Sequence, residues 1–119
     1  MFPGKTTGAA SALTASCAPS GTAPEIVYVW TPAKTGTATI QTCSATDTDF
    51  DTVLYVRLSC AAPPDFACNN DTVGCDVAGM AGKGSTITTS VLAGVPYFII
   101  VDGNAGASGK YKLTVIPPP

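Results

Sequence analysis

Three aspartates spaced by two residues, Asp47, Asp49 and Asp51, are the side chains best suited to chemistry. Alternate side chains of an extended chain project to the same side, so this spacing would gather the three carboxylates. Like charges that close repel each other unless a cation or several hydrogen-bond donors offset them. A second oxygen-rich group follows farther along the chain and consists of Asn69, Asn70 and Asp71.

Carboxylate and amide oxygens are hard ligands that suit Ca²⁺, so the two groups predict one calcium site closed by two loops. The spacing is not that of an EF-hand. Counting from Asp47 places Thr52 at the glycine position and Leu58 at the position of the bidentate glutamate. The alternative interpretation is that these side chains satisfy backbone groups as Asx turns in a solvated loop.

The commonest catalytic mechanisms lack their residues in this chain. It contains no histidine, which excludes Ser-His-Asp and Cys-His nucleophile activation and any imidazole zinc site. Paired carboxylates do occur, but on predicted loops and not in the context of a glycosidase. The sequence therefore predicts a protein that is not an enzyme.

Composition limits the partners and the compartment. Six Lys and Arg against eight Asp and Glu give a net charge of −2, without the basic stripe that nucleic acid requires. The longest apolar run, residues 95–101, is far shorter than the roughly 20 residues that cross a bilayer. Five cysteines among Thr, Ser, Gly and Pro indicate disulfides in an oxidising, extracellular or cell-surface location. One cysteine is then left buried and inert, or available to another chain.

The elements that must position these residues are short strands. Hydrophobic alternation and turn residues predict strands over residues 25–32, 36–43, 51–58, 66–68, 85–92, 96–102 and 110–116. The first two form a predicted hairpin, and the unbroken apolar run within the strand at residues 96–102 predicts that this strand is buried on both faces. About seven to nine short strands predict an all-β, antiparallel, jelly-roll-like sandwich.

The sandwich is expected to span residues 17–116. Residues 1–16 are expected to form an arm or an irregular first strand, and residues 117–119 the start of a proline-rich linker. Several aromatic side chains are candidates for a sugar-binding face, although mid-strand rings more often pack in a core. They are Tyr28, Trp30, Tyr55, Phe98 and Tyr111.

The order of segments along the chain resembles a known family. APEIVYVWTPAKTGTATIQTC is followed by DFDTVLYVRLSC, FACNND and VPYFIIVDGNAGASGKYKLTV. This succession, from about Cys17 to Ile116, is similar to bacterial pre-peptidase C-terminal domains, in particular to a cysteine-bearing variant of large secreted proteins. Such domains are appended β-sandwiches, and some relatives bind Ca²⁺, extracellular polymers or collagen.

The resemblance implies pairing of Cys17 with Cys43 and of Cys60 with Cys68, which leaves Cys75 as the free or intermolecular thiol. It also places Asp51, Asp71 and Asp102 at the acidic positions of the family pattern. The sequence departs from the pattern in the ATDT insertion before Asp49 and in the segment NNDTVGCDVAGM.

Two functions are expected from these observations. The first is a non-catalytic extracellular accessory or binding module, stabilised by Ca²⁺, whose partners are neighbouring domains, an extracellular polysaccharide or a protein polymer. The second is a self-assembling filament or surface-layer subunit that binds copies of itself by strand exchange or edge pairing.

Overall fold

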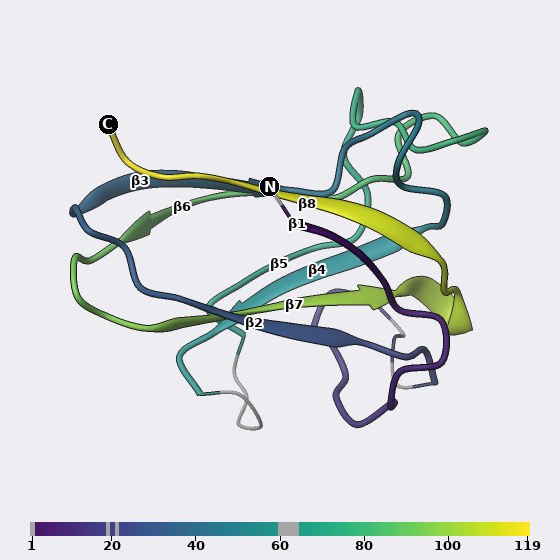
Figure 1. The fold of residues 1–119 in the computed structure, drawn as a ribbon, viewed down its shortest axis with the longest axis horizontal. Helices are drawn as coiled ribbons and strands as arrows, with labels where there is room; N and C mark the ends of the chain where they lie inside the picture. The colour runs from purple at the N-terminus through teal and green to yellow at the C-terminus, as the bar shows by residue number, and fades with distance from the viewer. Residues whose placement is uncertain (1, 19, 21, 60–64) are drawn as a thin grey trace.

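The computed structural model describes residues 2–18, 20, 22–59 and 65–119, which form two packed antiparallel sheets (Figure 1). Sheet 1 has the order β1-β8-β3-β6, with β1 at Phe2–Lys5, β3 at Gly36–Gln41, β6 at Thr86–Val91 and β8 at Lys110–Ile116. Sheet 2 has the order β2-β7-β4-β5, with β2 at Ile26–Trp30, β4 at Thr52–Arg57, β5 at Ala67–Asn69 and β7 at Tyr97–Gly103. One 3-10 turn, η1 at Asn104–Gly106, follows β7. The predicted all-β sandwich is confirmed.

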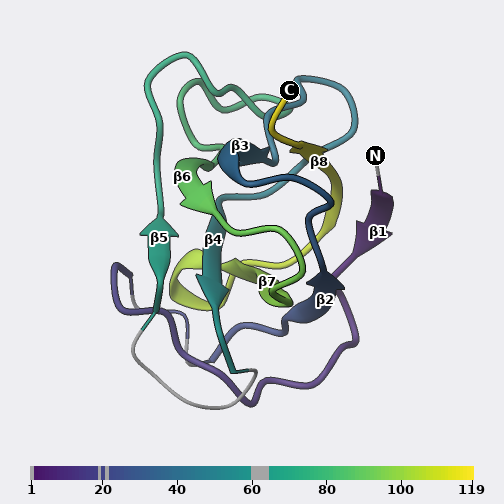
Figure 2. The same cartoon turned by 90° about the vertical axis from the view of Figure 1, so that its left-hand side faces the viewer.

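The core lies between the two sheets, which Figure 2 shows as separate layers. Alternation decides which side chains enter it: in β8, Tyr111 and Leu113 are buried while Lys110 is exposed, as the sequence predicts. The hydroxyls of Tyr28 and Tyr111 lie 2.6 Å apart and link the two sheets. The buried cluster consists of Ala38, Ile40, Phe50, Leu54, Val56, Ile87, Val91, Tyr97, Ile99, Val101, Tyr111 and Leu113.

The two central strands of sheet 2, β4 and β7, are buried on both faces. All six residues of β4 are buried, and β7 is buried at every position except Phe98, as its apolar run predicts. The second face is covered by residues 6–18, here called the strap, which run below sheet 2 in Figure 1. Ala15 of the strap packs in a second cluster with Val53, Tyr55 and Ile100. No helix of the described residues is long and apolar enough to cross a membrane.

A buried ion pair fixes the strap to β4. Arg57 Nε lies 2.6 Å from Asp65 Oδ1, and both side chains are almost fully buried. Arg57 also donates to the carbonyl oxygen of Thr14 at 2.6 Å, and the backbone N–H of Ser16 donates to Asp65 Oδ2 at 2.7 Å. Burial alone would raise the pKa of Asp65, but the hydrogen bonds from Arg57 and Ser16 hold it below its usual value.

The predicted hairpin over residues 25–32 and 36–43 is wrong. β2 pairs with β7 in sheet 2, whereas β3 pairs with β6 and β8 in sheet 1. The connection between them crosses from one layer to the other instead of turning back within a sheet. Pro32 ends the first strand, and its carbonyl oxygen accepts a hydrogen bond from Gly94 N–H at 2.9 Å in the connection between β6 and β7.

The ends of the chain pack beside the sandwich. Residues 2–5 of the expected arm form the regular edge strand β1, paired with β8. Gly4 permits this pairing because a Cβ atom there would lie 2.5 Å from the Tyr111 hydroxyl oxygen. In the expected linker, Pro118 is buried beside Gly36.

The disulfides join other cysteines than the resemblance implies. Cys17 pairs with Cys68 and Cys43 pairs with Cys75, so the expected Cys17–Cys43 and Cys60–Cys68 pairings and the free thiol at Cys75 are all wrong. The physical reason is the layering. Cys17 belongs to the strap, which covers the outer face of sheet 2, and Cys68 lies on that face. Cys43 follows β3 in sheet 1. Cys60, expected to pair with Cys68, lies outside the described residues. The bonds close loops of 51 and 32 residues, each worth about 4 kcal/mol by chain entropy.

Trypsin digestion without reduction tests this pairing directly. We expect one species containing three peptides, residues 6–34, 35–57 and 58–83, because both bonds lead into the last peptide. Cleavage before aspartate should then leave residues 65–70 attached to Cys17 and residues 71–75 attached to Cys43. A product that joins 6–34 to 35–57 and leaves 58–83 separate would overturn the assignment.

Candidate calcium site

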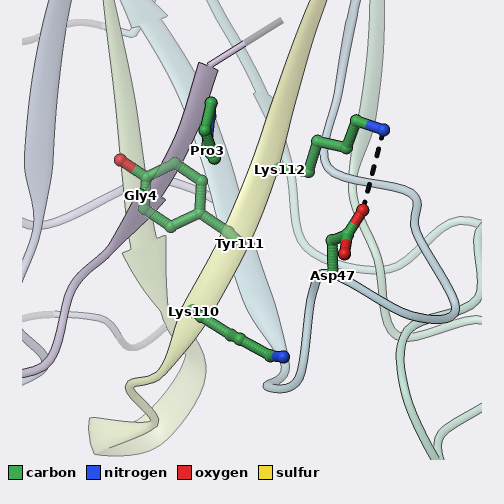
Figure 3. A pocket seen from close by; sticks show the side chains of 6 residues that line it. All are labelled: Pro3, Gly4, Asp47, Lys110, Tyr111 and Lys112. Carbon is green, nitrogen blue, oxygen red and sulfur yellow. Dashed lines mark ion pairs between the residues drawn. The ribbon is translucent and has the colours of Figure 1, made fainter.

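Asp47 and Asp49 are held along β8 and do not lie with the other predicted ligands. Residues 45–47 form a turn, so the extended chain that would have aligned the three aspartates is absent. Asp47 Oδ2 lies 3.6 Å from Lys112 Nζ (Figure 3), and Asp49 Oδ1 accepts a hydrogen bond from Lys110 N–H at 3.0 Å. Both aspartates therefore attach this loop to the edge of β8.

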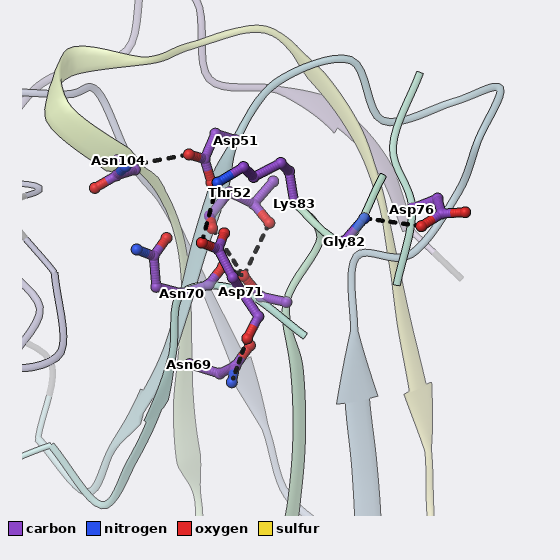
Figure 4. Close-up of polar contacts among 10 residues, drawn as sticks. Asp51, Thr52, Asn69, Asn70, Asp71, Asp76, Gly82, Lys83 and Asn104 are labelled. Carbon is purple, nitrogen blue, oxygen red and sulfur yellow. Dashed lines mark hydrogen bonds and ion pairs between the residues drawn. The ribbon is translucent and has the colours of Figure 1, made fainter. Parts of the chain in front are cut away.

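Asp51, Asn70 and Asp71 are brought together by strand pairing. Asp51 immediately precedes β4, and Asn70 and Asp71 immediately follow β5. Because β4 and β5 are antiparallel, the start of one lies beside the end of the other. β7 ends at the same place, and Asn104 Nδ2 donates to Asp51 Oδ2 at 3.1 Å (Figure 4).

Two oxygen atoms at this place are buried without a partner among the described residues. They are Asp51 Oδ1 and Asn70 Oδ1. Buried polar atoms in native structures are nearly always hydrogen-bonded, and exceptions often mark a water or an ion. Both atoms are acceptors, so the missing partner is a donor or a cation.

The local charge also favours a cation. Burial raises the pKa of Asp51, the hydrogen bond from Asn104 opposes that rise, and the nearby Asp71 carboxylate raises the pKa further. The counter-charge is Lys83, whose Nζ lies 3.3 Å from Asp71 Oδ2. Its side chain is 46% exposed, and such a pair neutralises a site only weakly.

Polar side chains of the inner strands brace the floor of the site. The Ser85 hydroxyl lies 2.8 Å from the carbonyl oxygen of Thr52 and 2.7 Å from that of Asn70. Asn69 Oδ1 accepts hydrogen bonds from Thr86 N–H at 3.2 Å and from the Thr72 hydroxyl at 2.8 Å. The predicted ligand Asn69 therefore links β5 to β6, and its side-chain oxygen is already hydrogen-bonded within the protein.

Within the described part of the chain, no three His, Cys, Asp or Glu side chains gather as a metal cage. The group that can hold Ca²⁺ is smaller than predicted: two carboxylates and one amide oxygen, from Asp51, Asp71 and Asn70. Sequence reasoning missed Asn104 and Ser85. The only signal for Asn104 was its position directly after a buried strand, and Ser85 carried none.

Asp102 belongs to a separate buried network beneath the strap. Its Oδ2 accepts from the Tyr55 hydroxyl at 2.8 Å, and its Oδ1 accepts from Gly103 N–H at 2.8 Å. Glu25, 8% exposed, accepts from Ala12 N–H at 2.7 Å, while its Oε2 has no partner among the described residues. Burial raises the pKa of Asp102 to about 6 despite its hydrogen bonds, and the Glu25 charge adds to the rise.

The aromatic candidates do not form a common platform. Tyr55 and Tyr111 are buried, with relative exposures of 0% and 2%. Tyr28 and Trp30 pack against the core, and Phe98 packs on the strap side of sheet 2. Their placement matches the alternative interpretation as packing residues.

No protein-family model, curated protein or solved structure was found to match the chain.

Asp102 should make stability depend on pH. Because its folded pKa is about 6 against an ordinary value of 3.8, its contribution is complete below about pH 4 and is lost as pH rises through 6. With chelator present, the free energy of unfolding should fall by roughly 1–3 kcal/mol between pH 4.5 and 7.5 in urea titrations. Asp102→Asn should reduce this dependence of the unfolding free energy on pH. Asp76→Asn, a matched surface control, should leave it unchanged. Equal slopes in all three proteins would contradict the assignment.

Proposed function

We propose that the chain is a non-catalytic, extracellular accessory module of a secreted or surface protein, of the kind seen in pre-peptidase C-terminal domains. Ca²⁺ bound by Asp51, Asn70 and Asp71 would fix its loops. The observation that carries the calcium part is the pair of buried, unpartnered oxygens at Asp51 and Asn70. The absence of histidine supports the non-catalytic part.

The location of the site explains how Ca²⁺ would act. It joins the start of β4, the end of β5 and the turn after β7, and the Cys43–Cys75 bond fixes the same loop end of the molecule. A bound ion would therefore hold three connections together without touching the core. The two disulfides indicate an oxidising, extracellular-type environment. Extracellular calcium sites with few protein ligands bind in the range of about 10⁻⁴–10⁻³ M.

Thermal melts with and without Ca²⁺ test this site. For a Kd near 1 mM, 10 mM Ca²⁺ should stabilise the fold by about 1.4 kcal/mol, which corresponds to roughly 4–6 °C in Tm. Asp51→Asn should abolish the shift and retain stability in chelator, because the amide keeps an acceptor for Asn104 and removes the buried charge. Asp47→Asn is the matched control and should keep the full shift. If the Tm of the unmodified protein does not change on addition of Ca²⁺ or of chelator, the calcium site is refuted.

One observation favours the second function, self-assembly through sheet edges. β2 is one of the two edge strands of sheet 2 and carries no charged residue. Val29 is 62% exposed and Val27 is 36% exposed on its outer face. An uncharged edge strand with exposed valines lacks the usual protection against pairing with another chain.

The edge-pairing function predicts a concentration-dependent dimer. Light scattering coupled to size-exclusion chromatography should show it for the unmodified chain, and Val29→Lys should leave only monomer because edge lysines oppose strand pairing. Thr88→Lys on β6, which lies across the sandwich, is the control and should not change the dimer. Monomer at every concentration with and without reductant would eliminate this function.

A further inference from the structure

Three lysines lie together on the outer face of sheet 1. The antiparallel register of β1 and β8 places Lys5 directly opposite Lys110 and Pro3 directly opposite Lys112. Tyr111 and Leu113 point into the core, so Lys110 and Lys112 point away from it. Half of the six Lys and Arg of a chain with net charge −2 therefore occupy one end of one face.

This arrangement is unfavourable for the isolated fold. Like charges placed directly opposite each other on paired strands destabilise a sheet, and Lys5 and Lys110 are both exposed at such positions. The acidic side chain that forms an ion pair with one of the three lysines is Asp47. Its Oδ2 lies 3.6 Å from Lys112 Nζ, and its side chain is 52% exposed. Asp49 faces the backbone N–H of Lys110. An anionic ligand would relieve the repulsion between Lys5 and Lys110.

The surface beside the lysines is hollowed. A cavity of about 380 Å³ lies over the β1–β8 pair, with Pro3, Gly4 and Tyr111 on one side and Asp47, Lys110 and Lys112 around it (Figure 3). Figure 3 shows the side chains of Lys110 and Lys112 extending past the strand on the side of Asp47. A carboxylate in this hollow would lie within reach of both ammonium groups.

The rest of the face carries hydroxyl and amide groups. On β3 and β6 the inward residues are Ala38, Ile40, Ile87 and Val91, so the alternate residues face outward. Strand register pairs these outward residues across the sheet. They are Thr37, Thr39, Gln41, Thr86, Thr88 and Ser90. These groups could hydrogen-bond a polyhydroxylated ligand, and the exposed Ile116 of β8 lies beside them, opposite Thr39.

We propose that the outer face of sheet 1 binds an acidic polysaccharide, with Lys5, Lys110 and Lys112 contacting its carboxylates and the threonine strands contacting its hydroxyls. Charge complementarity and the hydroxyl-lined face together favour a uronic acid polymer over an acidic protein segment. The proposal deepens the binding role in the proposed function and rests on that role. It does not depend on the calcium site, which lies at the start of β4 in the other sheet.

Binding to polygalacturonate, measured by biolayer interferometry in chelator at low salt, tests the proposal. The triple variant Lys5→Gln/Lys110→Gln/Lys112→Gln should bind at least about tenfold more weakly, since several surface charge contacts are lost together. Replacement of the same three lysines by arginine should retain binding. Lys110→Gln alone should weaken binding measurably, whereas Lys34→Gln, a matched exposed lysine elsewhere, should not. Neutral dextran should not bind, and raising the salt concentration should weaken the polygalacturonate complex.

Three results would overturn the proposal. The first is equal binding by the unmodified protein and the triple glutamine variant. The second is equal weakening by Lys34→Gln and Lys110→Gln, which would show a general charge effect. The third is binding of poly-L-glutamate or anionic vesicles as tight as that of polygalacturonate, which would assign the face to another class of partner. Asp51→Asn separates the two proposals, because it should remove the Ca²⁺ effect and leave polygalacturonate binding unchanged.

Discussion

Burial of the second face of sheet 2 is the constraint on which the rest of the structure depends. β4 and β7 carry apolar side chains on both sides, so the sandwich core covers only half of them. The strap covers the other half, and the charged groups that it encloses are engaged with it: Arg57 and Asp65 form a buried pair, and Glu25 accepts strap N–H groups. The Cys17–Cys68 bond ties the same segment to β5. Removing the strap would expose valine, tyrosine and isoleucine side chains together with buried charge.

Much of the fold follows from residue alternation, because burial on one face of a strand leaves a period of two. The inward Tyr111 and Leu113 of β8 and the apolar run of β7 were predictable for this reason. Pairing partners were not predictable from this signal, because β2 and β3 alternate alike whether they share a sheet or lie in different ones. The disulfides depend on the same choice of layer. Nothing along the chain separates Cys17 from Cys43, but Cys17 lies in the strap over sheet 2 whereas Cys43 follows β3 of sheet 1.

The candidate site shows the same limit at the level of single residues. Residue types and spacing predicted one ligand group, of which the structure brings Asp51, Asn70 and Asp71 together and holds Asp47 and Asp49 along β8 instead. The register of the strands decides which residues lie together. Thr52 lies opposite Gly103 and Leu54 lies opposite Asn69, so the ends of three strands meet around Asp51. A turn at residues 45–47 directs the other two aspartates toward β8. Neither register nor that turn is encoded in ligand spacing.

The pairing of β1 with β8 has a mechanical consequence. Because these strands are antiparallel, with Phe2 opposite Leu113, the two ends of the chain leave the sheet from the same side. A pulling force applied through both ends would load the hydrogen bonds of this pair one after another, as in a zipper, and would peel β1 away at low force. Peeling would continue along the strap until the tension reached Cys17, where the covalent bond to Cys68 would carry it. The first 16 residues would thus extend first, and the disulfide would keep residues 18–67, with β2, β3 and β4, out of the load path, while β6, β7 and β8 would still carry the load.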